Sequence, residues 1–239
     1  MEKKYCRKHI GKVYLTNEGY EAKVIDGGSK LNYCTIRIED YTTEAIYTHI
    51  RKGKIKYPFH PSLFGKGYIG VGKYSWKMHR DLYNAWWRMV QRCYDSKCHE
   101  RSPTYKDAIV CNEWLNFQNF AEWYERNFAE GFELDKDLLV PGNKTYGPEV
   151  CLLIPRKLNS FLANSCSTNT SGYTGVSWHK ASNKWAAAIH ANGKNKALGY
   201  FTDKEEASNA YKEARQEQAA VMRELYKNIL PENALNLIR

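Results

Sequence analysis

Long apolar runs are missing from this chain of 239 residues, and their absence excludes whole classes of protein. No stretch approaches the roughly 20 consecutive apolar residues of a membrane-spanning helix. The first residues, MEKKYCRKH, lack the apolar core of a secretory signal peptide. We therefore expect a soluble, cytoplasmic protein with no membrane partner.

Cysteine is present but does not form the dense framework of a secreted scaffold, because the residues are odd in number and scattered. The seven cysteines are Cys6, Cys34, Cys93, Cys98, Cys111, Cys151 and Cys166. We expect reduced thiols. Cys93, Cys98, His99 and Cys111 have zinc-ligand chemistry, but their spacing matches no standard zinc knuckle, so no structural zinc is expected.

Acidic residues are too few to balance the basic ones: 26 Asp and Glu face 36 Lys and Arg, a net charge of +10. The excess lies at the two ends. Residues 1–80 carry 16 basic and 7 acidic residues, residues 81–164 carry 10 and 12, and residues 165–239 carry 10 and 7. Basic flanks around a mildly acidic middle suit a protein that grips a polyanion and keeps carboxylates for metal chemistry, although a solvated surface would look similar.

Residues 1–72 are rich in Gly, Tyr and β-branched residues, which predicts a small β-rich accessory module. Alternating runs at 12–15, 20–25 and 33–38 are the expected strands. Lys52 and Lys54 form a basic loop suited to phosphate contact. The series Gly65, Gly67 and Gly70 is spaced like a dinucleotide fingerprint, but no βαβ context surrounds it, so we interpret it as a turn-rich loop.

Two segments follow with helical spacing of their apolar residues, 77–94 and 110–128. Each has an aromatic stripe on one face. Large rings at this spacing most often supply a hydrophobic core, so we expect core packing here rather than base stacking.

Residues 133–161 read as a strand from Glu133 to Val140, a loop, a second strand from Val150 to Ile154, and a helix that begins at Pro155 and carries Asn159. This β-β-α order, with Asp135-Lys136 on the first strand, resembles the HNH (ββα-metal) nucleases. A wider stretch, from Tyr83 to Asn159, resembles HNH-type proteins of bacteriophages and mobile elements; its features include Val110-Cys111-x-x-Trp114 and Leu134-Asp135-Lys136-Asp137.

The resemblance implies a phosphodiester-hydrolysing site. Asp135 and Asn159 would ligate one Mg²⁺ or Mn²⁺ ion, and Asp135, Lys136, Asp137 and Asn159 are the candidate catalytic residues. Where the family has a histidine base, this chain has Lys136, and a lysine accepts protons near neutral pH only when its pKa is lowered by several units. Three alternatives stay open: Lys136 positions phosphate while Asp137 or a histidine is the base, Lys136 is itself the base, or the domain only binds.

Residues 172–215 read as three short strands followed by one helix, with an open polar face on the sheet. The segment resembles the plant ethylene-response-factor type (AP-two) DNA-binding domain, through Tyr173-x-Gly175-Val176, Trp185-x-Ala187-x-Ile189 and Leu198-Gly199-x-Phe201. That family lays its sheet in the major groove of DNA. The positions implied to contact double-stranded DNA are Thr174, Ser177, His179, Lys180, Lys184, Ala188, His190, Lys194 and Lys196. Arginines that could read guanine are absent, so we expect lysine-driven, salt-sensitive binding.

These features predict an α+β, multidomain chain. The expected parts are the accessory module at 1–72, an HNH-like nuclease domain at 77–164, a polar linker at 165–171 and a sheet-plus-helix DNA-binding domain at 172–230. The expected function is a site-selective, metal-dependent homing endonuclease in the cytoplasm of a bacterial or phage-infected host cell. The alternative is a non-catalytic DNA-binding protein or regulator built from the same parts.

Overall fold

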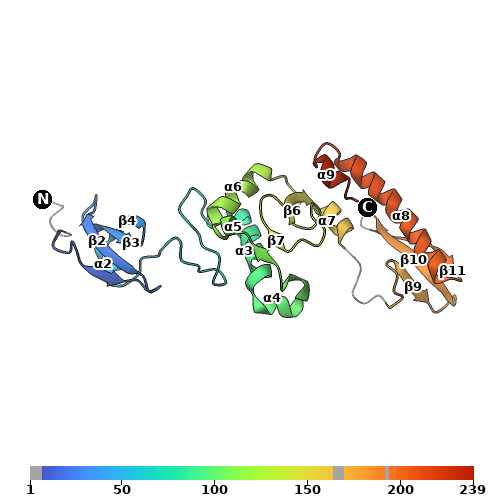
Figure 1. Cartoon of the computed structure of the whole chain (residues 1–239), viewed down its shortest axis with the longest axis horizontal. Helices are drawn as coiled ribbons and strands as arrows, with labels where there is room; N and C mark the ends of the chain where they lie inside the picture. The colour runs from blue at the N-terminus through green and yellow to red at the C-terminus, as the bar shows by residue number, and fades with distance from the viewer. Residues whose placement is uncertain (1–6, 164–169, 192–193) are drawn as a thin grey trace. The chain divides into compact units, whose positions relative to one another are not determined.

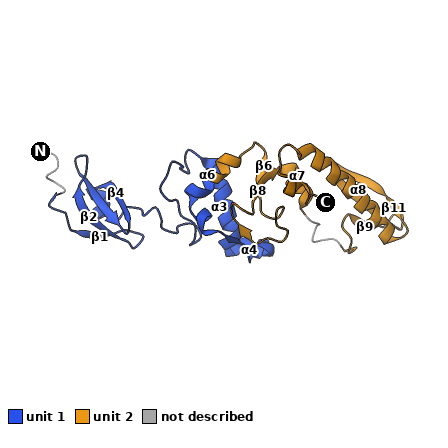
Figure 2. Ribbon diagram, turned by 45° about the horizontal axis from the view of Figure 1, so that its top comes forward, with its two compact units in different colours: residues 1–122 blue, residues 123–239 orange. Residues whose placement is uncertain are grey.

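The computed structural model describes residues 7–163, 170–191 and 194–239. It contains both helices and strands, so the α+β prediction is confirmed (Figure 1). Contacts divide the chain into two compact units, residues 1–122 and residues 123–239 (Figure 2). The finer division into four parts stays a prediction. In the described part of the chain, no helix is both long and apolar enough to cross a membrane.

The first unit begins with an antiparallel sheet of four strands in the order β1-β2-β3-β4. The strands are β1 (Val13–Leu15), β2 (Glu21–Gly27), β3 (Tyr33–Ile38) and β4 (Tyr41–Ile46), and the short helix α2 (Tyr47–Arg51) follows. The strand β4 was not predicted. It is short of large aliphatic residues, and it owes its place to complete pairing with β3, from Tyr33 opposite Ile46 to Ile38 opposite Tyr41.

The core of this sheet comes from alternate residues of its central strands, as the period of a strand requires. Ala22, Val24, Ile36 and Ile38 are each exposed by 1% or less. Cys34 lies among them and is disulfide-bonded, so the prediction of reduced thiols is wrong at this position. Cys93, Cys98, Cys111 and Cys151 are free thiols.

Helices α3 (Arg80–Tyr94), α4 (Ser96–Arg101), α5 (Asn112–Leu115) and α6 (Phe117–Asn127) follow, with the 3-10 turn η1 (Pro103–Tyr105) between α4 and α5. The prediction of one helix over 110–128 is wrong at Asn116. This residue adopts an extended conformation and forms a β-bridge with Tyr68, which separates α5 from α6. The bridge to a distant segment outweighs local helical periodicity.

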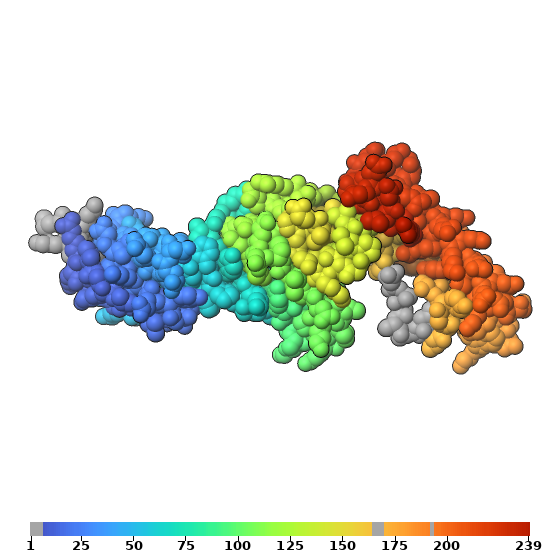
Figure 3. All heavy atoms as spheres, in the orientation of Figure 1, coloured from blue at the N-terminus to red at the C-terminus, as the bar shows by residue number. Residues whose placement is uncertain are grey.

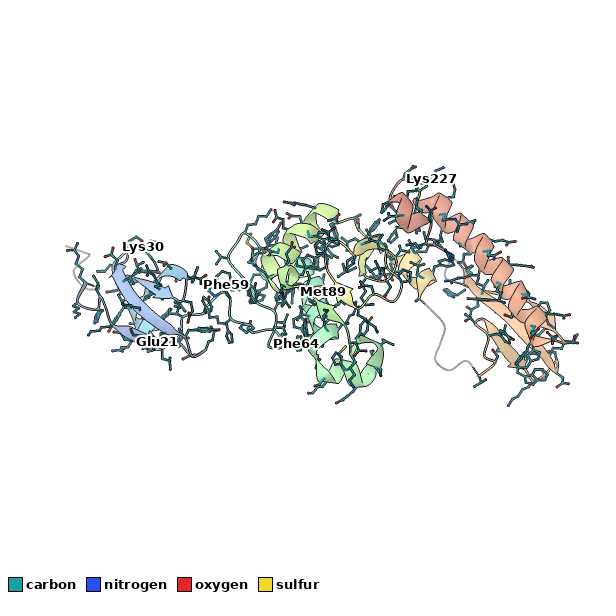
Figure 4. All side chains as sticks on the ribbon, in the orientation of Figure 1. Glu21, Lys30, Phe59, Phe64, Met89 and Lys227 are labelled. Carbon is teal, nitrogen blue, oxygen red and sulfur yellow. The ribbon has the colours of Figure 1, made fainter. Side chains whose placement is uncertain are left out.

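The aromatic stripes of these helices form a core, as predicted. Trp86, Trp114, Phe117 and Phe120 are fully buried. The Trp86 indole nitrogen donates a 2.7 Å hydrogen bond to the Trp114 carbonyl oxygen, so the polar edge of the ring is satisfied inside the core. Met89, labelled in Figure 4, is buried on the same side of α3.

The second unit holds the predicted β-β-α segment and, after it, an antiparallel sheet in the order β11-β10-β9. The elements are β6 (Phe132–Asp135), β7 (Thr145–Tyr146), β8 (Leu152–Pro155), α7 (Arg156–Leu162), β9 (Val176–His179), β10 (Lys184–Ala191), β11 (Lys194–Phe201), α8 (Lys204–Tyr226) and α9 (Glu232–Leu235). Asp203 caps the N-terminus of helix α8, because its carboxylate accepts hydrogen bonds from the backbone nitrogens of Glu205 and Glu206.

Helix α8 contributes to two separate cores. Its first turns place Ala207 against Val176 and Ala187 of the three-stranded sheet. Its last turns, together with α9, belong to a core that includes the β-β-α segment. Figure 3 shows the outer surface of these C-terminal helices in red. That core consists of Leu138, Ile154, Leu158, Phe161, Ala219, Met222, Tyr226, Leu230, Ala234 and Ile238. The Arg215 guanidinium adds a cation-π contact at 3.7 Å from the Phe161 ring centroid.

Gly175 allows α8 to approach the sheet. Its φ of +73° is a left-handed conformation, and an added Cβ would lie 2.1 Å from the Tyr211 ring. No side chain larger than hydrogen fits there without moving the helix.

We therefore expect Gly175→Ala to lower the free energy of unfolding by roughly 2–4 kcal/mol, combining left-handed strain with overpacking. The matched control is Gly172→Ala. Gly172 has a similar φ of +82° but nothing within 4 Å of an added Cβ, so only about 1 kcal/mol of strain should appear. Urea unfolding of both variants measures the difference, and equal losses would show that the Tyr211 contact is unimportant.

Candidate functional site

The candidate catalytic residues lie on a β-β-α unit, as the sequence predicts. Strand β6 pairs antiparallel with β8, with Glu133 opposite Ile154 and Asp135 opposite Leu152, and α7 follows β8 directly. The predicted strand Glu133 to Val140 is too long, because the observed strand ends at Asp135. The Asp135 carboxylate accepts hydrogen bonds from the backbone nitrogens of Asp137 at 3.0 Å and Leu138 at 2.7 Å, which bends the chain into a turn.

Pro155 also differs from its prediction, since it closes β8 and caps α7 instead of standing inside the first turn. Its extended backbone, with ψ of 136°, continues the strand up to the first helical residue. The helix still carries Asn159, as expected.

Glu133 is the residue that joins the strand to the helix. Its two carboxylate oxygens accept hydrogen bonds from Arg156 Nε at 2.7 Å and from Asn159 Nδ2 at 2.9 Å. Glu133 and Asp135 lie two residues apart on β6 and so share one face of the strand, the face on which α7 presents Asn159. The sequence marks Glu133 only as the first residue of the expected strand, although strand alternation puts it on the same face as Asp135.

The contact between Glu133 and Asn159 decides which end of the Asn159 amide is left for a ligand. Its nitrogen is engaged by the Glu133 carboxylate, so the oxygen remains as the donor atom for a cation. In the described residues, no group of three or more His, Cys, Asp and Glu is placed to hold a metal ion. Both Glu133 oxygens already accept hydrogen bonds, so the side-chain donors that would suit a hard divalent cation are the Asp135 carboxylate and the Asn159 amide oxygen.

The charge of Asp135 is poorly compensated. Burial raises the pKa of its carboxyl group above the ordinary value of 3.8, and the Asp137 carboxylate adds to the rise, while two backbone N–H bonds and Lys136 oppose it. A divalent cation beside this carboxylate would supply the missing positive charge, and this is the feature of the site that fits a metal best.

Lys136 is held inside the loop that follows β6. It is only 9% exposed, and its ammonium donates hydrogen bonds to Asp137 Oδ1 at 2.5 Å and to the carbonyl oxygen of Asn143 at 2.7 Å. The Asn143 amide in turn donates to the carbonyl oxygens of Lys136 and Thr145 and accepts from the Thr145 nitrogen. Asn143 thus fixes the loop, a role that the sequence signalled only through the Pro141-Gly142-Asn143 turn.

The three-stranded sheet presents the predicted DNA-contact residues in two groups. Val176 and Ala187 face α8, so Ser177 and Ala188 point to the opposite, open face. His179 shares that face, where its ring lies 4.8 Å from the Tyr200 ring and its Nδ1 is hydrogen-bonded to Ser182 Oγ. His190 is exposed and hydrogen-bonded to Asn195 Oδ1. The open face therefore gathers two imidazoles, a phenol and small residues.

The predicted DNA-contacting lysines do not all lie on this open face. Lys184 is paired with His179 and shares the open face, whereas Lys196 is paired with the buried Ile189 and so projects on the α8 side of the sheet. Lys180, Lys194 and Thr174 are exposed. Asn192-Gly193, a sequence typical of a hairpin turn, lies outside the described residues, as does most of the predicted linker 165–171. Lys52 and Lys54 are exposed beside the buried Gly53, in the other unit of the chain.

The potential zinc ligands have other surroundings. Cys93 is buried, and burial raises the pKa of the Cys111 thiol, which disfavours the thiolate that a zinc ion requires. The His99 Nε2 atom is hydrogen-bonded to the Arg92 carbonyl oxygen at 2.9 Å.

Comparison of the chain with protein-family models, with curated proteins and with solved structures finds no match.

The raised pKa of Asp135 predicts a pH-dependent effect of Asp135→Asn on stability. A carboxyl whose folded pKa is raised favours folding below its unfolded pKa, near 3.8, and loses this contribution as pH rises through the folded value. Asparagine keeps the acceptor oxygen and does not ionise. Asp135→Asn should therefore be more stable than wild type at neutral pH, with the advantage shrinking toward about pH 3.

Urea unfolding at several pH values measures this difference, with Asp107→Asn on an exposed residue as the control. The control should show no such pH-dependent gain. A constant or reversed difference for Asp135→Asn would contradict the idea that this carboxylate is destabilised by its surroundings.

Proposed function

We propose that this chain is a site-selective, divalent-metal-dependent DNA endonuclease of the HNH-like, homing type. The observation that carries the proposal is the β-β-α unit itself, in which the Asn159 amide of α7 is hydrogen-bonded to Glu133 of β6 and Asp135 lies two residues further along the same strand. A three-stranded sheet with an open face of imidazoles lies in the same unit of the chain. We infer a bacterial or phage-infected host cytoplasm and double-stranded DNA as the partner.

Asp135 and Asn159 would hold one Mg²⁺ or Mn²⁺ ion, and Glu133 would orient the Asn159 amide. When bound, the cation neutralises charge that develops on the scissile phosphate and on the leaving oxygen. The protein supplies a carboxylate that is already desolvated and an amide whose direction is set by a hydrogen bond. Outer partners of this kind tune a metal site.

The contacts of Lys136 favour a positioning role over a proton-accepting one. Its ammonium donates to Asp137 and to the Asn143 carbonyl oxygen, and an ammonium group has three N–H donors and no lone pair with which to accept a proton. Asp137, whose side chain is 54% exposed, can accept a proton from water. We therefore assign the base to Asp137 and assign Lys136 to holding it in place.

A second function follows from the same contacts. The carboxylate assigned as base is paired with an ammonium group, and no histidine stands at position 136. A domain in which this pair has become purely structural would bind DNA without cutting it. The alternative is thus a DNA-binding protein or regulator on a degenerate HNH scaffold.

Nicking of supercoiled plasmid in Mg²⁺ or Mn²⁺ separates the two functions. We expect wild type to nick, and Asp135→Asn and Asn159→Ala to lose at least about 100-fold in rate. Glu133→Gln should lose less, about 10-fold to 100-fold, because it acts through Asn159. Asp107→Asn is the control and should cut like wild type.

Gel retardation of the same plasmid completes the comparison. If wild type retards DNA but leaves it supercoiled in magnesium, manganese and zinc, the endonuclease proposal is wrong and the regulator stands. Chelation by EDTA should abolish nicking and leave retardation unchanged if the proposal is right.

The role of the sheet requires point variants, because deleting residues 165–239 would remove Met222 and Tyr226 from the core beneath α7. The double variant His179→Ala with His190→Ala should lower affinity for a duplex selected from a random library by about 10-fold, and bring it closer to the affinity for unselected DNA.

Lys196→Gln, on the α8 side of the sheet, is the matched control and should reduce affinity only slightly and without regard to sequence. Fluorescence anisotropy with both duplexes measures the two effects. A larger loss of DNA affinity for Lys196→Gln than for the double histidine variant would indicate that DNA binds the α8 side of the sheet, which would contradict the proposal.

A further inference from the structure

The glycine series that follows the first sheet belongs to a basic stretch with no acidic residue. Between Glu44 and Asp81 the chain has eight Lys and Arg residues and neither Asp nor Glu. Lys66, Lys73 and Lys77 fall in the segment 65–78, GKGYIGVGKYSWKM, which we call the glycine loop. The segment begins after Phe64, labelled in Figure 4.

The glycine loop is fixed by one buried glutamine. Gln118 is 8% exposed, and its side-chain nitrogen donates to the carbonyl oxygens of Ile69 and Tyr74 at 3.0 Å each. Its oxygen accepts from the Tyr74 nitrogen at 3.0 Å. A primary amide that makes three bonds to the backbone of one loop sets that loop's conformation.

Two glycines make this attachment sterically possible. A Cβ on Gly70 would lie 2.2 Å from Asn116 Oδ1, and one on Gly72 would lie 2.3 Å from Gln118 Oε1. Gly70, the last glycine of the series that is spaced like a dinucleotide fingerprint, and Gly72 beyond it thus allow the close approach of two amide side chains.

The far end of the loop is fixed in a similar way. Tyr74 is buried against Phe117, and the Ser75 nitrogen donates to His79 Nδ1 at 3.1 Å. The Met78 nitrogen donates to the Ser75 hydroxyl oxygen at 3.3 Å. The backbone between these anchors is therefore held in a turn.

This fixed turn exposes large apolar side chains. Val71 is 56% exposed, Trp76 54% and Met78 83%. Lys73 and Lys77 are exposed between them, and the Lys77 ammonium lies 5.5 Å from the Trp76 ring centroid. Rigid exposure of a tryptophan among cations is costly in water and is typical of a surface that meets a partner.

We propose that the glycine loop is a DNA-docking element, in which Lys73 and Lys77 contact phosphates and Trp76 packs against sugars and base edges. The inference rests on the proposed function and extends DNA contact to a surface apart from the three-stranded sheet. The 36-residue absence of carboxylates, from 45 to 80, complements a polyanion and would give a protein partner's basic groups nothing to pair with.

The test measures binding in EDTA, so that cutting plays no part. A labelled duplex is titrated with the full chain at several salt concentrations by fluorescence anisotropy. Lys73→Gln with Lys77→Gln should reduce the dependence of log affinity on log salt by up to about 0.9 for each lost phosphate contact. Trp76→Ala should weaken binding by about 5-fold to 100-fold, and Trp76→Phe should restore most of it.

The matched control is Lys97→Gln with Lys106→Gln, which removes the same charge from exposed positions of the same unit. Equal changes in the salt dependence for both lysine pairs would reduce the effect to net charge and overturn the proposal. Unaltered DNA binding by Trp76→Ala would also overturn the proposal. So would loop variants that keep their DNA binding and lose binding to anionic phospholipid vesicles.

The outcomes also separate this proposal from the proposed function. If wild type binds no duplex, both are wrong. If wild type binds and nicks DNA while the loop variants match it, only the loop proposal is wrong. Thermal unfolding of each variant checks that the fold is retained, which we expect because the substituted side chains are exposed.

Discussion

The second unit depends on one hydrophobic core, the one in which the end of α8 and helix α9 meet the β-β-α segment. Met222, Tyr226 and Ile238 fill one side of it, and Ile154 and Leu158 fill the other. Full burial of each large apolar side chain is worth about 1.5–3 kcal/mol, and the short strands β6 and β8 have little else to bury. The β-β-α segment therefore folds as part of a larger body, and the helix that covers the three-stranded sheet completes it.

The acidic side chains of strand β6 are fixed by hydrogen bonds. Glu133 is tied to α7 by Arg156 and Asn159, while Asp135 is tied to its own turn by backbone N–H groups. The pKa of Asp135 is nevertheless raised, because its burial outweighs those two bonds. A carboxylate whose pKa is raised by burial opposes folding when it is ionised. Destabilising groups of this kind are common where a site is prepared for a ligand.

The sequence predicts those features that depend on local period. The strands and helix after Gly172 follow from alternation and turn residues, and the β-β-α order follows from its flanking signals. Three features depend on distant partners instead. Asn116 is extended because Tyr68 bridges to it, β4 exists because β3 pairs with it, and Glu133 gains its role from Asn159. Periodicity shows which face of α8 is apolar, but not that its two halves belong to different cores.

Because α8 is continuous across both cores, it limits which recombinants of this chain can fold. A recombination breakpoint in the polar stretch 165–171 would replace the sheet and, with it, the helix that supplies Met222 and Tyr226 to the other core. An incoming sheet would have to bring a helix of matching length and apolar phase. Inheritance of the two parts is thereby coupled, because a single breakpoint between Ala207 and Ala219 would also separate Met222 and Tyr226 from the β-β-α segment. Only a replacement with one breakpoint in 165–171 and a second inside α8 would exchange the sheet and keep both cores.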